Sequence, residues 1–565
     1  MLAASVAALA THPAAAQDRP LTPTDPTAAL PEPPQTSPPL ERETPPADPA
    51  AGEVAIVEFR AARFTGVKAV DEARLRPAWQ DQVGRQLTLS DLRAIARRAE
   101  AIYADAGYPF VAVVVPAQEI RDGTVQFNVV EGRITDLTML GADPIARRQA
   151  AAAFQPLVDR EPLAADDLER AYEAARTTPG LSIAGALRRG SRPGGMDLVL
   201  QTRRRGYRAY ANINNLFSDP VGPWGVLVGV DVFGGSLYGD QTSIQLYSTF
   251  ETDEQQVLRL SHSRRINRHG TNVAATYMVA DSNPQGVVAP LDLATDVQVF
   301  RAEVSHPLVA RLNGGVAVSV AFDWSDQETA VFNQIALTED RTRVLSARLA
   351  GRWRNDRIIA NGFLEARQGL DLGDASQPGD PLLSRPEGDP QAFVVRAGAD
   401  AEVEVFPRVR LYGRVEGQFT EDVLLAPDEY SVGNLTIGRG YDPGSGFGDR
   451  ALGMVLEGRL GPYEFVGPVR WSPFVFYDRV RLENEDSTGV VPEATLSSLG
   501  GGLRFEWPGR GRLDVVYAKP RDPLPVPNPP PGLEEPDERI LVNLTLSLDP
   551  LFDGMFARFS RGDRR

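Results

Sequence analysis

The sequence predicts an α+β protein with two small N-terminal units, each of order β-α-α-β-β, followed by a large all-β barrel that crosses a membrane. Three observations predict this fold. Helical periodicity is confined to the residues before Gly206. Beyond Gly206, segments of about ten residues alternate between apolar and polar side chains, as barrel strands do. The chain also begins with an apolar segment typical of an export signal.

The composition excludes several classes of protein. The chain has 565 residues, of which 42% are hydrophobic and 24% charged, so it can bury several cores. No stretch approaches the roughly 18 consecutive apolar residues of a transmembrane helix, so strands would have to cross a membrane. A formal charge of -16 argues against a nucleic-acid partner. The absence of cysteine and the scattered positions of the four histidines predict no disulfide, metal or other cofactor.

The first 52 residues are expected to direct and tether the protein rather than to fold. Residues 1–16 are predicted to be a signal peptide, with an apolar run at 2–9 and small residues at the cleavage site. No Lys or Arg precedes Arg19, so the leader is expected to begin upstream of this sequence. Residues 17–52 contain 11 prolines and are predicted to be an extended, disordered linker.

The first folded unit is predicted over residues 53–132 and opens with a strand near 54–60. A helix follows, in which Thr88 and Asp91 form an N-terminal capping box and Gly107 marks the end. One face of this helix is apolar, at Leu92, Ile95, Ala96, Ala99, Ile102, Tyr103 and Ala106. Two strands, FVAVVVPAQ and TVQFNVVEG, are joined by an Asp-Gly turn.

The second unit repeats this plan over residues 133–205. Its elements are predicted to be a strand at 133–140, helices at 144–154 and 164–177, and strands near 181–187 and 196–202.

The barrel is predicted over residues 206–548, with a C-terminal tail at 549–565. Strict alternation is clear in FVVRAGADAEVEV (393–405), LSARLAGRWR (345–354) and ILVNLTLSL (540–548). A soluble sheet with one wet face would alternate in the same way, but its strands are usually five or six residues long. Strands of about ten residues match a tilted bilayer crossing and favour a membrane barrel, which leaves no sheet edge unpaired in lipid.

Several motifs carry a resemblance to a known family. The first unit contains Gly107, Tyr108, Pro116, Gln118, Glu131 and Gly132. TTPGLSIAGALRRG follows in the second unit and Tyr-Gly-Asp at 238–240 in the barrel, and residues 424–460 give the strongest match. With these motifs the chain resembles the two-partner secretion transporters of the TpsB family. The resemblance implies two periplasmic POTRA domains and an Omp85-type barrel of sixteen antiparallel strands in the bacterial outer membrane.

The resemblance also implies a site inside the barrel. In this family an arginine-glycine-aromatic loop folds into the lumen, and its arginine pairs with an aspartate on an inward-facing strand. Arg439, Gly440 and Tyr441 match the loop, and Asp478 matches the aspartate. Alternation places Asp478 in phase with Phe474 and Phe476 but leaves open which face meets lipid, so the inward aspartate rests on the resemblance.

The sequence departs from the family pattern at several positions. Val480 replaces a glycine two residues after the aspartate, Gly438 replaces an aliphatic residue, and Asn434 replaces the second glycine of a pair. These changes leave the charge pair intact but put the local strand geometry in question. The proline-rich linker also excludes the N-terminal plug helix of some relatives, so any plug is expected to be a loop.

The function implied by the resemblance is export of a large partner exoprotein, of the haemolysin or adhesin type, across the outer membrane. The expected partners are this unfolded polypeptide and outer-membrane lipid, and the barrel is expected to be monomeric. Two alternatives remain at this point, an assembly factor or insertase of the same superfamily and a diffusion porin. The sequence contains no catalytic constellation or nucleotide-binding motif that would predict an enzyme.

Overall fold

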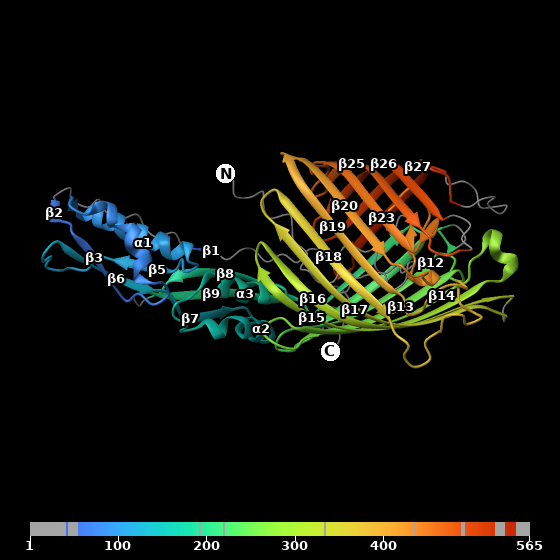
Figure 1. The fold of residues 1–565 in the computed structure, drawn as a ribbon, viewed down its shortest axis with the longest axis horizontal. Helices are drawn as coiled ribbons and strands as arrows, with labels where there is room; N and C mark the ends of the chain where they lie inside the picture. Colours follow the sequence, from blue (N-terminus) through green and yellow to red (C-terminus); the bar gives the residue numbers. More distant parts are fainter. Residues whose placement is uncertain are drawn as a thin grey trace, which may run out of the picture.

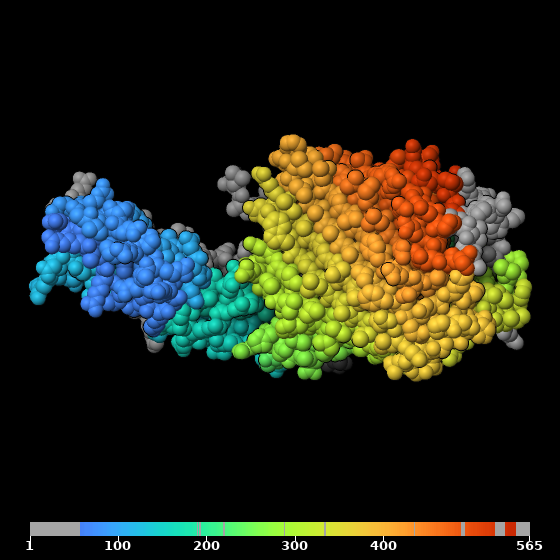
Figure 2. Space-filling view, viewed as in Figure 1, coloured from blue at the N-terminus to red at the C-terminus, as the bar shows by residue number. Residues whose placement is uncertain are grey.

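The computed structural model describes residues 41–42, 55–190, 194–218, 221–332, 335–433, 436–487, 492–525 and 537–549. Two small α+β units lie end to end and lead into a large barrel of tilted strands (Figure 1). The space-filling view shows the second unit against one end of the barrel (Figure 2). The predicted leader lies outside the described residues, as do the linker apart from 41–42 and the tail apart from Asp549.

The first unit contains two small sheets and one long α-helix. Its elements are β2 (Ala55–Glu58), β3 (Ala61–Thr65), the 3₁₀-helices η2 (Glu72–Ala78) and η3 (Gln80–Gln82), β4 (Gln86–Thr88), α1 (Leu89–Asp105), β5 (Val111–Val114) and β6 (Thr124–Glu131). The longer helical segment ahead of α1, η2, is a 3₁₀-helix. Pro77 lies within η2 and has no N–H to donate in an α-helical turn.

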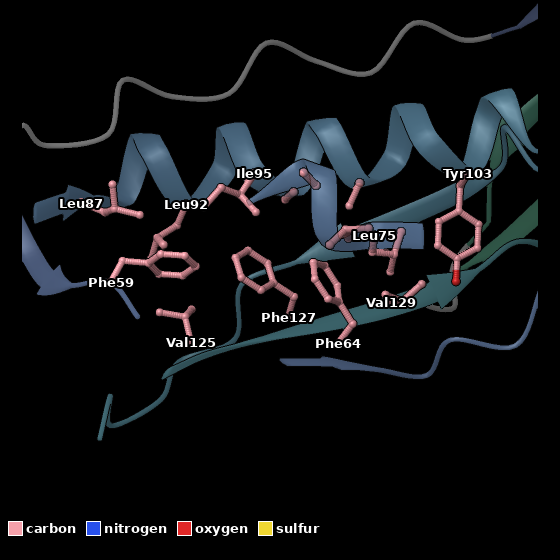
Figure 3. Packing of buried hydrophobic residues seen from close by; sticks show 14 of the residues in the cluster. Phe59, Phe64, Leu75, Leu87, Leu92, Ile95, Tyr103, Val125, Phe127 and Val129 are labelled. Atoms are coloured by element: carbon pink, nitrogen blue, oxygen red, sulfur yellow. The ribbon is translucent and has the colours of Figure 1, made fainter. Parts of the chain in front are cut away.

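The limits of α1 follow from its sequence. The Thr88 hydroxyl accepts a hydrogen bond from the Asp91 N–H, and the Asp91 carboxylate accepts one from the Thr88 N–H, which confirms the predicted capping box. Just beyond the helix, Gly107 has a φ of +91°, a conformation that favours glycine. The apolar face of α1 packs on the sheet in a core that includes Phe59, Phe64, Leu75, Leu92, Ile95, Tyr103 and Phe127 (Figure 3).

The second unit has the predicted β-α-α-β-β order. Its elements are β7 (Arg133–Leu140), α2 (Pro144–Phe154), the 3₁₀-helix η4 (Gln155–Leu157), α3 (Ala165–Arg176), β8 (Leu181–Arg189) and β9 (Gly195–Arg204). The sheet order is β1-β8-β9-β7, in which β1 (Glu41–Arg42) comes from the linker and pairs in parallel with β8.

The described residues of the C-terminal part form a closed antiparallel barrel of sixteen strands. The strands are β10 (Tyr207–Asn214), β11 (Gly225–Phe233), β12 (Asp240–Thr249), β13 (Gln255–Arg265), β14 (Asn272–Ser282), β15 (Ala294–Arg311), β16 (Gly314–Val331), β17 (Ile335–Arg354), β18 (Ile358–Gly369), β19 (Phe393–Phe406), β20 (Val409–Phe419), β23 (Arg450–Leu460), β25 (Arg470–Glu483), β26 (Glu493–Trp507), β27 (Gly511–Pro520) and β28 (Arg539–Ser547). β28 pairs with β10 to close the cylinder, and the short β24 (Tyr463–Glu464) pairs with the start of β25. Among the described residues, no helix has the length and apolar character needed to cross a membrane.

Three strands are much longer than both the expected length of about ten residues and the other barrel strands, of which the longest has 15 residues. β15 and β16 each have 18 residues and β17 has 20. The outer part of β17, residues 335–343, pairs with β16 but not with β18, so these strands continue beyond the closed part of the barrel. Alternation does not stop where the barrel wall ends, so the sequence pattern could not locate this extension.

Alternating faces define the inside and outside of the barrel wall. On β25, Phe474 and Phe476 are each 5% exposed and Asp478 is 0% exposed, whereas the intervening Val475 is 66% exposed. On β17, Leu345, Leu349 and Trp353 are exposed on the outer surface. Asp478 therefore faces the interior, which settles the alternative that alternation alone left open.

The second unit is tied to the barrel end through the C-terminus of α3. Arg265 of β13 donates hydrogen bonds to the carbonyl oxygens of Ala174 at 2.7 Å and Thr177 at 3.2 Å. Arg352 of β17 pairs with Glu173 in the same helix. Cations at a helix C-terminus satisfy its free carbonyl groups, so these contacts fix the unit against the barrel.

Candidate functional site

The loop that carries Arg439 enters the barrel as a small hairpin, and we call residues 430–448 the lumen loop. Its stem is formed by β21 (Tyr430–Val432) and β22 (Gly446–Gly448), which pair only with each other among the described residues. Val432, Ile437 and Tyr441 of this loop are buried against Val480 and Leu482 of β25. The loop therefore packs on the inner face of the barrel wall rather than in solvent.

Arg439 and Asp478 are in direct contact. The Arg439 guanidinium donates from Nε to Oδ2 of Asp478 at 2.9 Å and from Nη2 to Oδ1 at 2.7 Å. The backbone N–H of Arg439 donates a third bond to Oδ2 at 3.0 Å. This two-pronged arrangement uses the planar fork of arginine, which the single ammonium of lysine cannot reproduce.

Two further contacts of Arg439 were not anticipated from the sequence. Its Nη1 donates to Oε2 of Glu457 on β23 at 2.9 Å, and its guanidinium carbon lies 3.6 Å from the centre of the Phe476 ring. Arg459 also donates to Glu457, at 2.7 Å. Glu457 alternates in phase with Val455 on a buried face, and this pattern could have indicated that Glu457 faces the lumen. Its position opposite β25 depends on strand register, which alternation along one strand does not give.

The two residues after Arg439 fix the tip of the loop. Tyr441 is fully buried, and its hydroxyl lies 2.8 Å from the Asp522 carbonyl oxygen and 3.0 Å from that of Ser497. Gly440 lies so close to the wall that a Cβ there would come within 2.7 Å of the Ser498 Cβ. Glycine at 440 therefore allows the close approach of the loop to β26.

The departures from the family pattern have local explanations. Gly438 has a φ of +114°, which disfavours the aliphatic residue usual in the family. Val480 is fully buried and fills space beside Ile437 and Tyr441. Asn434 lies outside the described residues.

The predicted POTRA motif lies partly at the junction between the two N-terminal units. The carbonyl oxygen of Gly107 accepts a hydrogen bond from the Ala165 N–H at 3.0 Å, and that of Gly132 accepts one from the Leu163 N–H at 2.9 Å. A Cβ at Gly132 would come within 2.0 Å of the Phe110 carbonyl oxygen, so the position requires glycine. These two glycines therefore help to set the angle between the units.

The other motif residues organise the first unit internally. Oε1 of the buried Glu131 accepts bonds from the Lys68 N–H at 2.8 Å, the Ala69 N–H at 2.7 Å and the Tyr103 hydroxyl at 3.1 Å. Burial and the nearby Glu131 carboxylate raise the pKa of Tyr103, so its hydroxyl stays protonated as a donor.

The remaining motif positions flank the strand β5, with Tyr108 before it and Pro116 and Gln118 after it. The Gln118 side chain donates to the Gln126 carbonyl oxygen at 2.8 Å and accepts from the Gln126 N–H at 2.7 Å, as a paired strand residue would. The Pro116 carbonyl oxygen accepts a bond from Gln118 at 3.3 Å, and Tyr108 packs against the core of the unit. In the described part of the chain, no group of three or more His, Cys, Asp or Glu residues could hold a metal ion.

Comparisons with known proteins agree with this architecture. Residues 57–132 match the model of the ShlB-type POTRA domain, and residues 197–505 match that of the haemolysin secretion/activation protein family ShlB/FhaC/HecB. The chain is also similar to the heme/hemopexin transporter protein HuxB of Haemophilus influenzae, with 22% identity over 459 residues, which cover 78% of this chain and 80% of HuxB.

Solved structures show the same fold. CdiB from Escherichia coli superimposes with a TM-score of 0.71 at 15% identity, over 89% of this chain and 92% of CdiB. CdiB from Acinetobacter baumannii gives a TM-score of 0.63 at 13% identity, over 91% and 95% of the two chains. With a family match across more than half of its length and the POTRA-plus-barrel fold in place, the chain belongs to the ShlB/FhaC/HecB family of outer-membrane translocators, which export a partner exoprotein by two-partner secretion.

Proposed function

We propose that the lumen loop is the gate of this translocator and that the Arg439–Asp478 pair holds it closed at rest. The observation that carries the proposal is the bidentate pair buried against the barrel wall, with hydrogen-bond lengths of 2.7 and 2.9 Å. Opposite charges at about 4 Å attract by roughly 4 kcal/mol at an intermediate dielectric, before desolvation is deducted. Such an interaction is strong enough to fix a loop and weak enough to be broken in each transport cycle.

The two N-terminal units, residues 53–132 and 133–205, are proposed to act as POTRA domains that capture the unfolded exoprotein in the periplasm. Capture would occur by addition of an extended strand of the exoprotein to an open sheet edge, which recognises main chain rather than a particular sequence. Residues 206–548 then conduct the polypeptide outward. Since the sequence has no nucleotide-binding motif, folding of the exoprotein outside the cell would supply the driving force.

The proposed cargo is one large exoprotein of the haemolysin or adhesin type, and the proposed working form is a single barrel in outer-membrane lipid. Deletion of the gene tests this assignment against the insertase alternative. Export of the cognate exoprotein should stop, and the exoprotein should be degraded in the periplasm, while other outer-membrane barrels keep their normal levels. A general loss of outer-membrane barrels in the deletion strain would support an insertase instead.

A further inference from the structure

The stem of the lumen loop is flanked by two acidic residues, one on each side. Glu429 comes directly before β21, and Asp449 comes directly after β22. Asp449 is fully buried, and Glu429 is 9% exposed. Any movement of the whole loop must displace these two residues, because the chain passes through them to reach β20 and β23.

A single arginine from a different outer loop contacts both flanking residues, Glu429 and Asp449. Arg385 belongs to residues 370–392, which connect β18 to β19 at the barrel end opposite the POTRA domains. It donates from Nη1 to Oδ1 of Asp449 at 2.5 Å and from Nη2 to Oδ2 at 3.1 Å. The same Nη1 lies 3.1 Å from Oε1 of Glu429. The Arg385 side chain is only 13% exposed, so these contacts are largely shielded from water.

Asp449 is also the point where three outer loops meet. Besides the bonds from Arg385, it accepts one from the Leu424 N–H at 2.8 Å and one from the Glu485 N–H at 2.8 Å. Leu424 follows β20 and Glu485 follows β25, so the loops after β18, β20 and β25 converge on one carboxylate. Arg385 further pairs with Asp486 at 3.2 Å. It is therefore the cation that balances three neighbouring carboxylates.

From this geometry we propose that Arg385 is a positioning residue that clamps the stem of the lumen loop. The inference rests on the proposed gating function, because it specifies how the gate moves. With the stem clamped, release of Arg439 lets the tip swing inside the lumen while the base stays fixed. Without the clamp, the base itself detaches and the loop becomes accessible from outside the cell.

The absence of cysteine in the wild-type sequence makes a labelling experiment possible. Ser431 lies in β21 and is 6% exposed, so Ser431→Cys places a small thiol in the buried stem. Intact cells producing this variant are treated with a membrane-impermeant maleimide, and the rate of labelling reports how often the stem opens to the outside. Folding of each variant is checked separately by the heat-dependent gel mobility of the barrel.

Adding Arg385→Ala should raise the labelling rate at least about tenfold, since three carboxylates then lose their shared cation. Arg385→Lys should give an intermediate rate, because an ammonium keeps the charge but cannot bridge both oxygens of Asp449. Arg341→Ala is the matched control, since the ion pair of Arg341 joins β17 to Asp374 of the 370–392 loop, at 3.6 Å, rather than to the stem. If Arg385→Ala does not insert, Asp449→Asn tests the same contact with a smaller change.

The decisive comparison is with Arg439→Ala in the same Ser431→Cys background. If the clamp acts as proposed, freeing the tip leaves external labelling within about twofold of the parent, because the stem remains docked. Equal labelling of the parent and Arg385→Ala, or equal acceleration by Arg439→Ala and Arg385→Ala, would overturn the proposal. Failure of the gating function itself would appear differently, as normal secretion by Arg439→Ala.

Discussion

Replacing Arg439 by alanine is expected to impair export without preventing insertion of the barrel. The substitution removes two side-chain hydrogen bonds to Asp478, one to Glu457 and the contact with the Phe476 ring. Asp478 then stays buried with the backbone N–H of residue 439 as its remaining donor within the described part of the chain. The barrel strands themselves lose no backbone pairing, so folding and membrane insertion should persist.

The size of the effect follows from the burial of the pair. Removing one partner of a buried ion pair costs about 3–5 kcal/mol, because the other charge is left uncompensated. The lower limit of this range applies to Asp478, because water enters the lumen once the loop tip moves. About 3 kcal/mol corresponds to a roughly 150-fold increase in the population of the undocked loop tip.

Three measurements check this prediction. Planar-bilayer recordings of the purified barrel should detect longer or more frequent open states, secretion of the cognate exoprotein should fall, and heat-dependent gel mobility should remain that of a folded barrel. Arg301→Ala is the matched control, because Arg301 pairs with Asp323 and Glu303 on the barrel wall, at 2.8 and 2.9 Å, but lies outside the lumen loop. Wild-type secretion and unchanged conductance in Arg439→Ala would refute the gating role.

Four further substitutions test the local geometry. Glu457→Gln should affect conductance less than Asp478→Asn, because Arg439 keeps its bidentate partner in the first variant and loses the charge of that partner in the second; a larger effect at Glu457 would contradict this ranking. Gly440→Ala should undock the tip, since its Cβ would lie 2.7 Å from the Ser498 Cβ and 2.8 Å from the Pro520 nitrogen, and bilayer recordings should resemble those of Arg439→Ala. Tyr441→Phe removes the hydroxyl bonds of the tip and should weaken docking by about 0.5–1.5 kcal/mol, measured as a several-fold rise in open probability, whereas no change would mean that these bonds do not hold the tip.

Much of the fold could be predicted from the sequence, because local rules and the final structure agree there. The Thr88–Asp91 capping box set the start of α1, and alternation from Phe393 onward matched β19. The 3₁₀ segment at Glu72–Ala78 was missed, since its length and turn type depend on Pro77 and on packing against α1. The outward extension of β15 to β17 was missed because strand periodicity is the same inside and outside a membrane.

The site could be predicted in part, because the family resemblance supplied some of its residues. Arg439, Gly440 and Asp478 belong to a family motif, so the resemblance named them without knowledge of the register. Glu457 and Arg385 reach the lumen loop through strand register and a long outer loop. No local pattern marks such contacts, because each depends on which strands become neighbours after the barrel closes.

The two carboxylates that bind Arg439 have unequal roles in releasing it. When Arg439 leaves, Glu457 still has Arg459 at 2.7 Å and Arg504 at 4.0 Å, so its charge remains compensated. Within the described part of the chain, the hydrogen bonds that Asp478 accepts all come from Arg439. An unpaired buried carboxylate is strongly unfavourable, so in the proposed gating cycle Asp478 would supply the driving force that returns the loop to its docked position. The proposed opening would therefore bring water or a cationic segment of the exoprotein to Asp478, and the gate would close again when that substitute departs.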